Sequence, residues 1–280
     1  MKFGVNTWLW CSPFSMEHLN LLDKVKSFGY DSIEIAADDW NLIDCNVLHQ
    51  RLLDVDLSVT VCGAFGPSRD LTNDDERVRE NAIHYIIDSI RNTSRIGGRI
   101  FAGPFYSAVG KARFVDDEQR MREWERFIHG ARRVAQVASD EGVVLCMEPL
   151  NRFETDLINT TQQAMQAIEE IDQPSVALHL DTFHMNVEEK NLAFAIRLAG
   201  SRLQHFHANE NDRGVPGTGH IDWFTVGNAL RDVEFQGYLT IESFIPGVTE
   251  IAKAASIWRS LAASPDIMAK EGLSFLKKVI

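Results

Sequence analysis

Residues 143–148, with the sequence VVLCME, form a short apolar run that ends in the carboxylate of Glu148. Three later runs share this form, because each is apolar and each ends in a side chain that can bind a metal ion. They are VALHLD, which ends at Asp181, LQHFH, which ends at His207, and YLTIE, which ends at Glu242. Roughly 30 residues separate each run from the next, which is the length of one strand–helix unit. The runs therefore predict successive buried parallel strands, each with one polar side chain at its carboxyl end.

The same rhythm extends back to the N-terminus. Four earlier runs have the length of strands, at residues 2–7, 31–36, 57–62 and 98–103. Amphipathic segments of helical period lie between the runs, at residues 16–28, 78–96, 118–141, 161–171 and 225–232. Eight alternating units in 280 residues predict an α/β fold, a single (β/α)8 TIM barrel that spans residues 1–280 as one domain. Functional residues of such a barrel lie at the carboxyl ends of its strands.

The composition limits the partners of the chain. It carries 28 basic and 40 acidic residues, a net charge of −12, which is unfavourable for binding nucleic acid or an anionic membrane surface. No apolar run approaches the roughly 18 residues of a membrane span. The start of the chain, MKFGVNTWLWCSPF, lacks the apolar core of a secretory signal. We therefore expect a cytoplasmic protein with a small neutral partner. The scattered cysteines indicate buried thiols rather than disulfides: Cys11, Cys45, Cys62 and Cys146.

Three carboxylates and one imidazole, without a thiolate, form a donor set that suits Mn²⁺, Mg²⁺ or Co²⁺ better than Zn²⁺. We expect one divalent ion with four protein ligands: Glu148, Asp181, His207 and Glu242. Taken singly, an acid at a strand end often caps the next helix, and a histidine in a strand is often a hydrogen-bonded core residue. Taken together, the four complete a coordination set. His179 and His205 face inward one step deeper, so they are expected in the barrel interior rather than as a fifth ligand.

A cation in this site would have coordination positions left for a vicinal carbonyl and hydroxyl, so an α-hydroxyketone is the natural chelator. Polarisation of the carbonyl by the metal acidifies the hydrogen on the adjacent carbon. Glu148 and Glu242 come from strands separated by two others, so they can flank a substrate that lies over the barrel mouth. Removal of a proton on one face and its return on the other is an epimerisation. Further polar residues follow the strands in the adjoining loops: Glu154, His184 and Arg213, with Arg152, Glu210 and Asp212 expected at the surface.

The segments MEPLNRFE, LDTFHMN, HFHANENDRGVPGTG and IESF resemble the motifs of the ketose 3-epimerases. This family includes D-tagatose, D-psicose (D-allulose) and L-ribulose 3-epimerases and belongs to the sugar phosphate isomerase/epimerase TIM barrels. The resemblance implies that the four ligands hold Mn²⁺ or Co²⁺, and that Glu148 and Glu242 also act as the acid–base pair. It implies that Glu154, His184 and Arg213 bind the C1 to C3 end of the sugar. The implied reaction is epimerisation at C3 of free ketoses through a metal-bound cis-enediolate.

The resemblance also implies a homodimer or homotetramer, and the last amphipathic segment, residues 266–279, offers contact area. It is weaker in the first half of the chain. The residues there that match contacts to the far end of the sugar are equally compatible with ordinary packing: Trp8, Cys62, Gly63, Phe65 and Phe105. Asn6 stands where some members of the family have an aromatic residue. We therefore expect broad specificity at C4 to C6, with pentuloses and hexuloses both accepted.

Three other functions fit parts of the pattern. An aldose–ketose isomerase, such as a hydroxypyruvate or sugar isomerase, would use the same scaffold, because an enediolate can be reprotonated at either carbon. A metal-dependent DNA-repair endonuclease is disfavoured, because that chemistry needs several zinc ions and a basic groove. A sugar-binding protein without activity has no need for two carboxylates across the metal. A phosphorylated substrate is disfavoured because no glycine-rich phosphate cradle precedes a helix.

Overall fold

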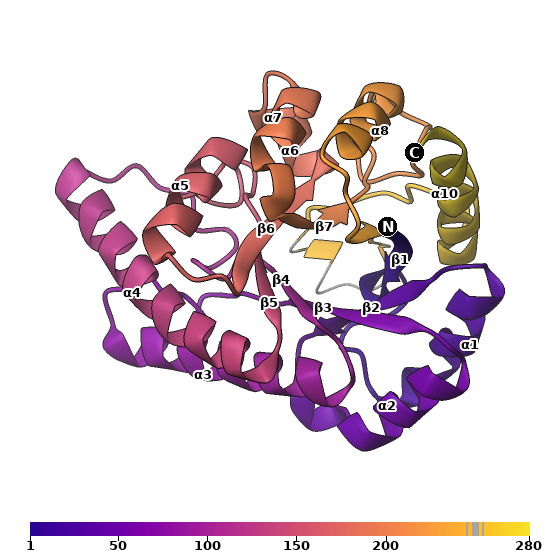
Figure 1. Cartoon of the computed structure of the whole chain (residues 1–280), viewed down its shortest axis with the longest axis horizontal. Helices are drawn as coiled ribbons and strands as arrows, with labels where there is room; N and C mark the ends of the chain where they lie inside the picture. Colours follow the sequence, from indigo (N-terminus) through magenta and orange to yellow (C-terminus); the bar gives the residue numbers. More distant parts are fainter. Residues whose placement is uncertain (245, 248–251, 254) are drawn as a thin grey trace.

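The computed structural model describes residues 1–244, 246–247, 252–253 and 255–280. Eight parallel strands close into a barrel in the order β1 to β8, with the helices around it (Figure 1). The strands are β1 Lys2–Asn6, β2 Ser32–Ala37, β3 Ser58–Gly63, β4 Ile100–Gly103, β5 Val144–Met147, β6 Val176–Asp181, β7 Leu203–His207 and β8 Tyr238–Ile241. Each observed strand overlaps its predicted run, so the predicted TIM barrel is confirmed.

The helices follow the strands in the predicted alternation. The α-helices are α1 Asn20–Ser27, α2 Cys45–Asp54, α3 Glu76–Arg95, α4 Asp117–Glu141, α5 Thr161–Ile171, α6 Thr182–Glu188, α7 Leu192–Ala199, α8 Trp223–Asp232 and α10 Pro265–Val279. Short 3-10 turns are η1 Thr7–Leu9, η2 Met16–His18, η3 Trp40–Leu42 and η4 Gly200–Arg202. The helix predicted at residues 16–28 is divided into η2 and α1. In the 3-10 turn the backbone N–H of Ser15 donates to His18 Nδ1, and such turns are frequent where an α-helix begins.

Aspartate caps fix where several helices begin. The side chains of Asp44, Asp75 and Asp116 accept hydrogen bonds from backbone N–H groups in the first turns of α2, α3 and α4. Such a cap satisfies donors that have no partner inside the helix. At the other end of α4, Gly142 adopts the left-handed conformation with φ 66°, which glycine does without a Cβ clash. These local signals set the length of each unit around the barrel.

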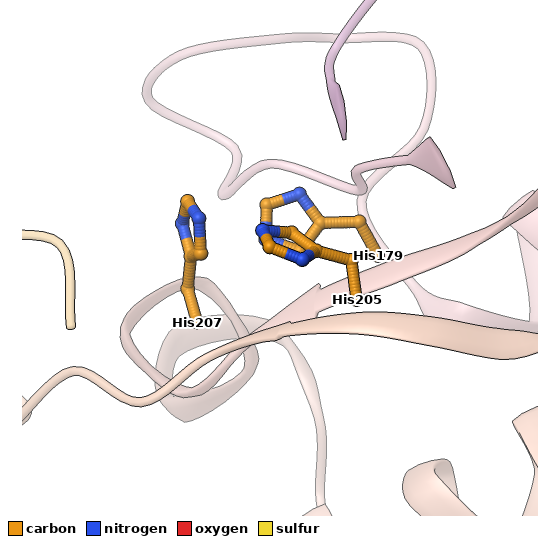
Figure 2. A group of neighbouring side chains, drawn as sticks. All are labelled: His179, His205 and His207. Atoms are coloured by element: carbon orange, nitrogen blue, oxygen red, sulfur yellow. The ribbon is translucent and has the colours of Figure 1, made fainter. Parts of the chain in front are cut away.

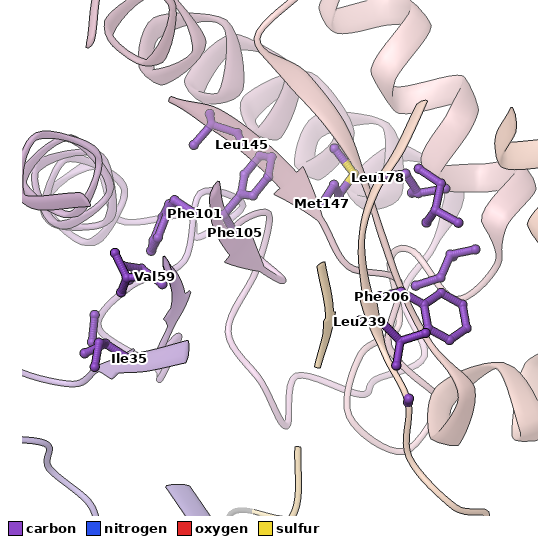
Figure 3. Packing of buried hydrophobic residues seen from close by; sticks show 14 of the residues in the cluster. Ile35, Val59, Phe101, Phe105, Leu145, Met147, Leu178, Phe206 and Leu239 are labelled. Atoms are coloured by element: carbon purple, nitrogen blue, oxygen red, sulfur yellow. The ribbon is translucent and has the colours of Figure 1, made fainter. Parts of the chain in front are cut away.

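The barrel wall separates two kinds of packing. Large apolar residues on the outer face of the strands pack beneath the helices, among them Phe101, Leu145 and Phe206 (Figure 3). Residues of β4 to β6 form a separate small apolar cluster of Ile100, Ala102, Cys146 and Ala177. Other fully buried positions of the strands are polar: Glu34, Thr60, His179, His205 and Thr240. Buried polar groups need hydrogen-bond partners, so we expect these side chains to bond to one another and to the polar residues at the barrel mouth.

Loops at the carboxyl ends of the strands surround the barrel mouth. Residues 66–75 follow β3 and residues 209–219 follow β7, as predicted for loops on this face. In the part of the chain that the structure describes, no helix combines the length and the apolar character needed to cross a bilayer.

Candidate active site

The carboxyl ends of β5 to β8 bring the four predicted metal ligands around one point. Asp181 and His207 end β6 and β7, while Glu148 and Glu242 directly follow β5 and β8. Each of the four has at most 5% of its surface exposed. His207 Nδ1 lies 3.6 Å from Glu242 Oε1 and 4.0 Å from Asp181 Oδ2. Donor atoms of Glu148, Asp181 and His207 lie within 4.8 Å of one another. One ion with bonds of about 2.1 Å fits these separations.

The donor set and the state of His207 both fit a divalent cation. His207 Nδ1 is buried and has no hydrogen-bond partner among the described residues. A buried, unpaired imidazole nitrogen that faces two carboxylates is the arrangement expected of a metal ligand. Among the described residues, no lysine or arginine forms an ion pair with Glu148, Asp181 or Glu242.

Without a bound cation, the negative charges of the carboxylates in this site are not balanced. Burial raises the pKa of Glu148 well above its usual range, and the neighbouring charges of Glu242 and Asp181 raise it further. Burial also raises the pKa of Asp181 to about 7. Burial opposes the protonated form of His207, but Glu34 and Glu242 outweigh it and raise the pKa of His207 well above its usual value. A bound cation would restore the ionised carboxylates and the neutral imidazole.

Asn209 links the two sides of the site. Its Nδ2 donates to Asp181 Oδ2 at 2.8 Å, and its Oδ1 accepts from the backbone N–H of Glu242 at 3.0 Å. The backbone N–H of Asn209 in turn donates to Thr182 Oγ1 at 2.8 Å. Asn209 therefore orients two of the predicted ligands, a role that the sequence analysis did not assign to it. In the sequence, its position two residues after His207 could have indicated this role.

Glu34 of β2 is the other functional candidate that the sequence analysis missed. Its side chain is fully buried, and its carboxylate lies 2.7 Å from His207 Nε2 and 2.6 Å from His205 Nε2. Burial alone would raise the pKa of Glu34, but the two histidines hold it well below its usual range. The signal was a charged residue between Ile33 and Ile35 in a run that predicts a fully buried strand.

His179 and His205 lie inside the barrel, next to the ring of His207 (Figure 2). The centroid of the His179 ring is 4.0 Å from that of His207 and 4.7 Å from that of His205. Burial lowers the pKa of both His179 and His205, which favours their neutral forms. His179 Nδ1 also lies 3.6 Å from Glu148 Oε2. These residues thus occupy the interior positions expected for them, behind the predicted ligands.

The three predicted sugar-binding residues reach the same site, Glu154 and Arg213 from the loops after β5 and β7 and His184 from helix α6 after β6. His184 Nε2 lies 3.8 Å from Glu148 Oε1 and 3.3 Å from Arg213 Nη2. The backbone N–H of Asn151 donates to His184 Nδ1 at 3.0 Å, so the ring proton of neutral His184 is on Nε2, which faces the site. Burial and the nearby Arg213 lower the pKa of His184 and so favour this neutral form. Arg213 Nη1 lies 3.7 Å from Glu154 Oε1, which also accepts from Asn151 Nδ2 at 3.0 Å.

The guanidinium of Arg213 is held by aromatic rings. It lies 4.0 Å from the centroid of Phe183 and 5.0 Å from that of Phe244. The backbone of Arg213 has a positive φ of 61°, a strained conformation for a residue with a side chain. Ser243 Oγ donates to the carbonyl oxygen of Arg213 and stabilises this conformation. The loop therefore positions one permanent positive charge beside the site.

Glu210 corrects one expectation. It was predicted at the surface, but it is fully buried and accepts hydrogen bonds from the backbone N–H groups of Gly217 and Ile221 and from Trp223 Nε1. These bonds fold the loop that carries Arg213. The surface interpretation holds for Arg152, which pairs with Glu188 and has a side chain that is 62% exposed.

An apolar wall borders the site on the side of β1 to β3. It consists of Trp8, Ala36, Cys62, Phe244, Ala252 and Ile257. Trp8 and Cys62 belong to this wall, whereas Phe65 and Phe105 belong to the main core. A side chain at Gly63 would place its Cβ 2.6 Å from the Phe65 ring, so this glycine serves packing. Asn6 donates to Glu34 Oε1 at 2.9 Å and leaves the wall without an aromatic residue at that position.

Comparisons with known proteins point to one group of enzymes. Residues 22–279 match the family model described as xylose isomerase-like TIM barrel. The chain is 33% identical to the D-psicose 3-epimerase of Ruminiclostridium cellulolyticum, over 95% of this chain and 92% of that protein. It is 31% identical to the L-ribulose 3-epimerase of Mesorhizobium japonicum, over 98% and 93% of the two chains. The crystal structure of D-psicose 3-epimerase with D-tagatose from Clostridium cellulolyticum H10 superimposes with a TM-score of 0.93 at 32% identity, covering 100% of this chain and 99% of that one.

Proposed function

The chain belongs to the xylose isomerase-like TIM-barrel family and, within it, to the ketose 3-epimerases, and on this premise we propose that it inverts C3 of free ketoses. It is an enzyme of the isomerase class, a carbohydrate epimerase. The proposed pairs are D-fructose and D-psicose, D-tagatose and D-sorbose, and L-ribulose and L-xylulose. The observation that carries the proposal is the convergence of Glu148, Asp181, His207 and Glu242 with His184 and Arg213 in one buried site.

We propose that one divalent ion per chain, Mn²⁺ or Co²⁺ with Mg²⁺ as the third candidate, is held by Glu148, Asp181, His207 and Glu242. When bound, it would polarise the ketose carbonyl and so acidify the hydrogen at C3. The remaining chemistry belongs to the side chains. Glu148 and Glu242 approach from β5 and β8, so one carboxylate removes the C3 proton and the other returns a proton to the opposite face. Exchange of these two roles gives the reverse reaction.

The negative charge that develops on the sugar oxygens faces two donors. His184 Nε2–H and the guanidinium of Arg213 are adjacent and are already oriented by Asn151, Phe183 and Phe244. Donors that are fixed in advance in a buried site stabilise an enediolate without reorganisation. Glu154, held by Asn151, is positioned to accept a hydrogen bond from a sugar hydroxyl. The apolar wall offers few hydrogen bonds to distal hydroxyls, which supports broad specificity at C4 to C6.

The direct test is product analysis with three sugars. D-Fructose, D-tagatose and L-ribulose are incubated with metal-stripped protein, with and without Mn²⁺, and the products are separated by chromatography. We expect C3 epimers that form only with metal. Aldose products alone would instead assign an aldose–ketose isomerase. No conversion of any of the three sugars would exclude them as substrates and point to a phosphorylated or acidic substrate. Epimerisation in deuterated water should label C3, because the returning proton comes from a carboxyl group that exchanges with solvent.

We also propose that residues 1–280 act as one catalytic domain within a homodimer or homotetramer. Support for association comes from the exposed aromatic residues Phe114 and Phe153, which are 104% and 74% exposed. The segment at 266–279 contributes less than expected, because the apolar face of α10, with Leu273 and Leu276, is buried in its own chain. Light scattering after size-exclusion chromatography measures the mass, and a monomer at micromolar concentration would reject this proposal.

A further inference from the structure

Glu34 contacts His207, one of the proposed metal ligands, and its carboxylate lies in the same group of donor atoms as His207 and Glu242. Strands β2 and β7, which carry the two residues, are not neighbours in the barrel, so the contact crosses the interior. Glu34 Oε1 lies 2.7 Å from His207 Nε2 and forms a hydrogen bond with it. The opposite ring nitrogen, Nδ1, faces Asp181 and Glu242.

This arrangement determines which ring nitrogen carries the proton. A carboxylate can only accept a hydrogen bond, so its partner Nε2 must be the protonated nitrogen. In the neutral ring, Nδ1 then has a free lone pair. We propose that Glu34 is a positioning residue, which fixes His207 in the Nε2–H form and directs the Nδ1 lone pair at the cation. The inference rests on the metal site of the proposed function but not on the identity of the sugar.

The carboxylate of Glu34 is itself fixed on every side that the structure describes. Asn6 Nδ2 donates to Oε1 at 2.9 Å, and Thr60 Oγ1 donates to Oε2 at 3.0 Å. His205 Nε2 lies 2.6 Å from Oε2. With these three contacts the carboxylate cannot rotate away from His207 without losing partners in a fully buried place. Asn6 thus helps to hold the Glu34 carboxylate against His207.

Removal of Glu34 should allow His207 to adopt either tautomer. In the form protonated at Nδ1, the nitrogen that faces the carboxylates has no lone pair and cannot bind a metal. Carboxylates that hold a metal-ligating histidine in this way typically account for a 10- to 100-fold change in metal affinity. Glu34 forms a hydrogen bond with His207, so we expect its effect on metal binding to act through this ligand.

The test measures Mn²⁺ binding by titration calorimetry at pH 8 in three variants. Glu34→Leu removes the acceptor and should weaken Mn²⁺ binding about 10- to 100-fold. Glu34→Gln keeps an amide oxygen that can accept from His207 Nε2, so it should restore most of the lost affinity. Glu123→Gln is the matched control, because Glu123 is also a buried glutamate, 1% exposed, but lies outside the site. It should bind Mn²⁺ as the unsubstituted protein does.

A second measurement uses the unsubstituted protein and so decides the question even if Glu34→Leu does not fold. In ¹⁵N NMR of the Mg²⁺-loaded protein, His207 should show a proton on Nε2 and none on Nδ1. A proton on Nδ1, or Mn²⁺ affinity in Glu34→Leu within twofold of the unsubstituted protein, would overturn the inference. If Glu34→Leu weakens Mn²⁺ binding while the unsubstituted protein converts no ketose, the positioning role stands and the proposed substrate fails.

Discussion

Two groups of charged residues in this molecule differ in their balance of charge. The barrel-mouth cluster consists of Glu34, Glu148, Asp181, His207 and Glu242. The loop network, which joins loops on the same face to the start of α4, consists of Asp70, Lys111, Arg113, Arg120, Glu123 and Asp156. The first contains four carboxylates and no lysine or arginine. The second contains three carboxylates and three permanent cations.

The pairing in the loop network is complete. Lys111 Nζ lies 2.8 Å from Asp70 Oδ2, and Arg113 Nη2 lies 2.9 Å from Glu123 Oε1. Arg113 and Arg120 both bond to Asp156, and their hydrogen bonds outweigh burial and lower its pKa. The same type of residue in the barrel-mouth cluster, Asp181, has a pKa raised to about 7.

The difference in charge balance indicates a structural role for the loop network and a functional role for the barrel-mouth cluster. A network with equal numbers of positive and negative charges holds loops in place without a ligand. A buried excess of negative charge costs free energy unless a bound cation balances it. Glu148 and Asp181, whose pKa values are raised, accordingly lie at the barrel mouth, where chemistry is proposed. Substitutions in the two groups should therefore affect different properties.

The largest effect is expected from Glu148→Gln. The amide cannot accept the C3 proton and is a poorer metal ligand, so kcat for epimerisation should fall about 10³-fold or more. Kinetics at saturating Mn²⁺ would measure it, with Glu123→Gln as the control that retains kcat. Turnover within tenfold of the unsubstituted protein would remove Glu148 from the proton transfer.

Arg213→Met should have the next largest effect. Methionine keeps apolar contact with Phe183 and Phe244 but removes the positive charge near the developing enediolate, so we expect kcat to fall about 10²-fold. Arg213→Lys keeps the charge and should recover part of the loss. Equal activity in the two variants would show that the charge is not what matters. Comparison of the fall in kcat with that of Glu148→Gln shows whether stabilisation of the enediolate charge or proton transfer contributes more to the rate.

Glu123→Gln should act on stability rather than on catalysis. Loss of a buried, paired carboxylate typically costs about 3–5 kcal/mol. Arg113 and Arg120 are 39% and 30% exposed, so water can solvate them and we expect about 1–3 kcal/mol here. Denaturant unfolding would measure the loss, and kcat at 25 °C should be unchanged. A large fall in kcat without a loss of stability would contradict the division between the two groups.

The smallest effect is the pH dependence of metal binding. The pKa of Asp181 is raised to about 7 in the folded, metal-free protein, so the folded state holds this proton more strongly than the unfolded state does. Stability of the metal-free protein from this group is therefore present at about pH 4 and is lost as the pH rises to about 7. Mn²⁺ competes with this proton, so the titration of Asp181 alone should raise its affinity about tenfold from pH 6 to pH 8. Calorimetry at both pH values checks this, and a constant affinity would contradict the shifted pKa.

The barrel could be predicted from the sequence because each strand carries its own local signal. A buried parallel strand is a short apolar run, and a turn and an amphipathic helix follow it, as in VVLCME and α5. The separate 3-10 turn at the start of residues 16–28 was not predicted, because an amphipathic pattern does not distinguish such a turn from the first turn of an α-helix. The burial of Glu210 was missed for a similar reason, since charge suggests the surface until partners are known.

The sequence by itself determined the eight strands, their common direction and the polar residues at the ends of β5 to β8, because periodicity and spacing are properties of neighbouring residues. Only the tertiary structure decided which polar residues meet. Glu34 and His207 are 173 positions apart in the chain, and closure of the barrel brings them within 2.7 Å. No local pattern specifies that contact, because it depends on the register of strands that face each other across the interior.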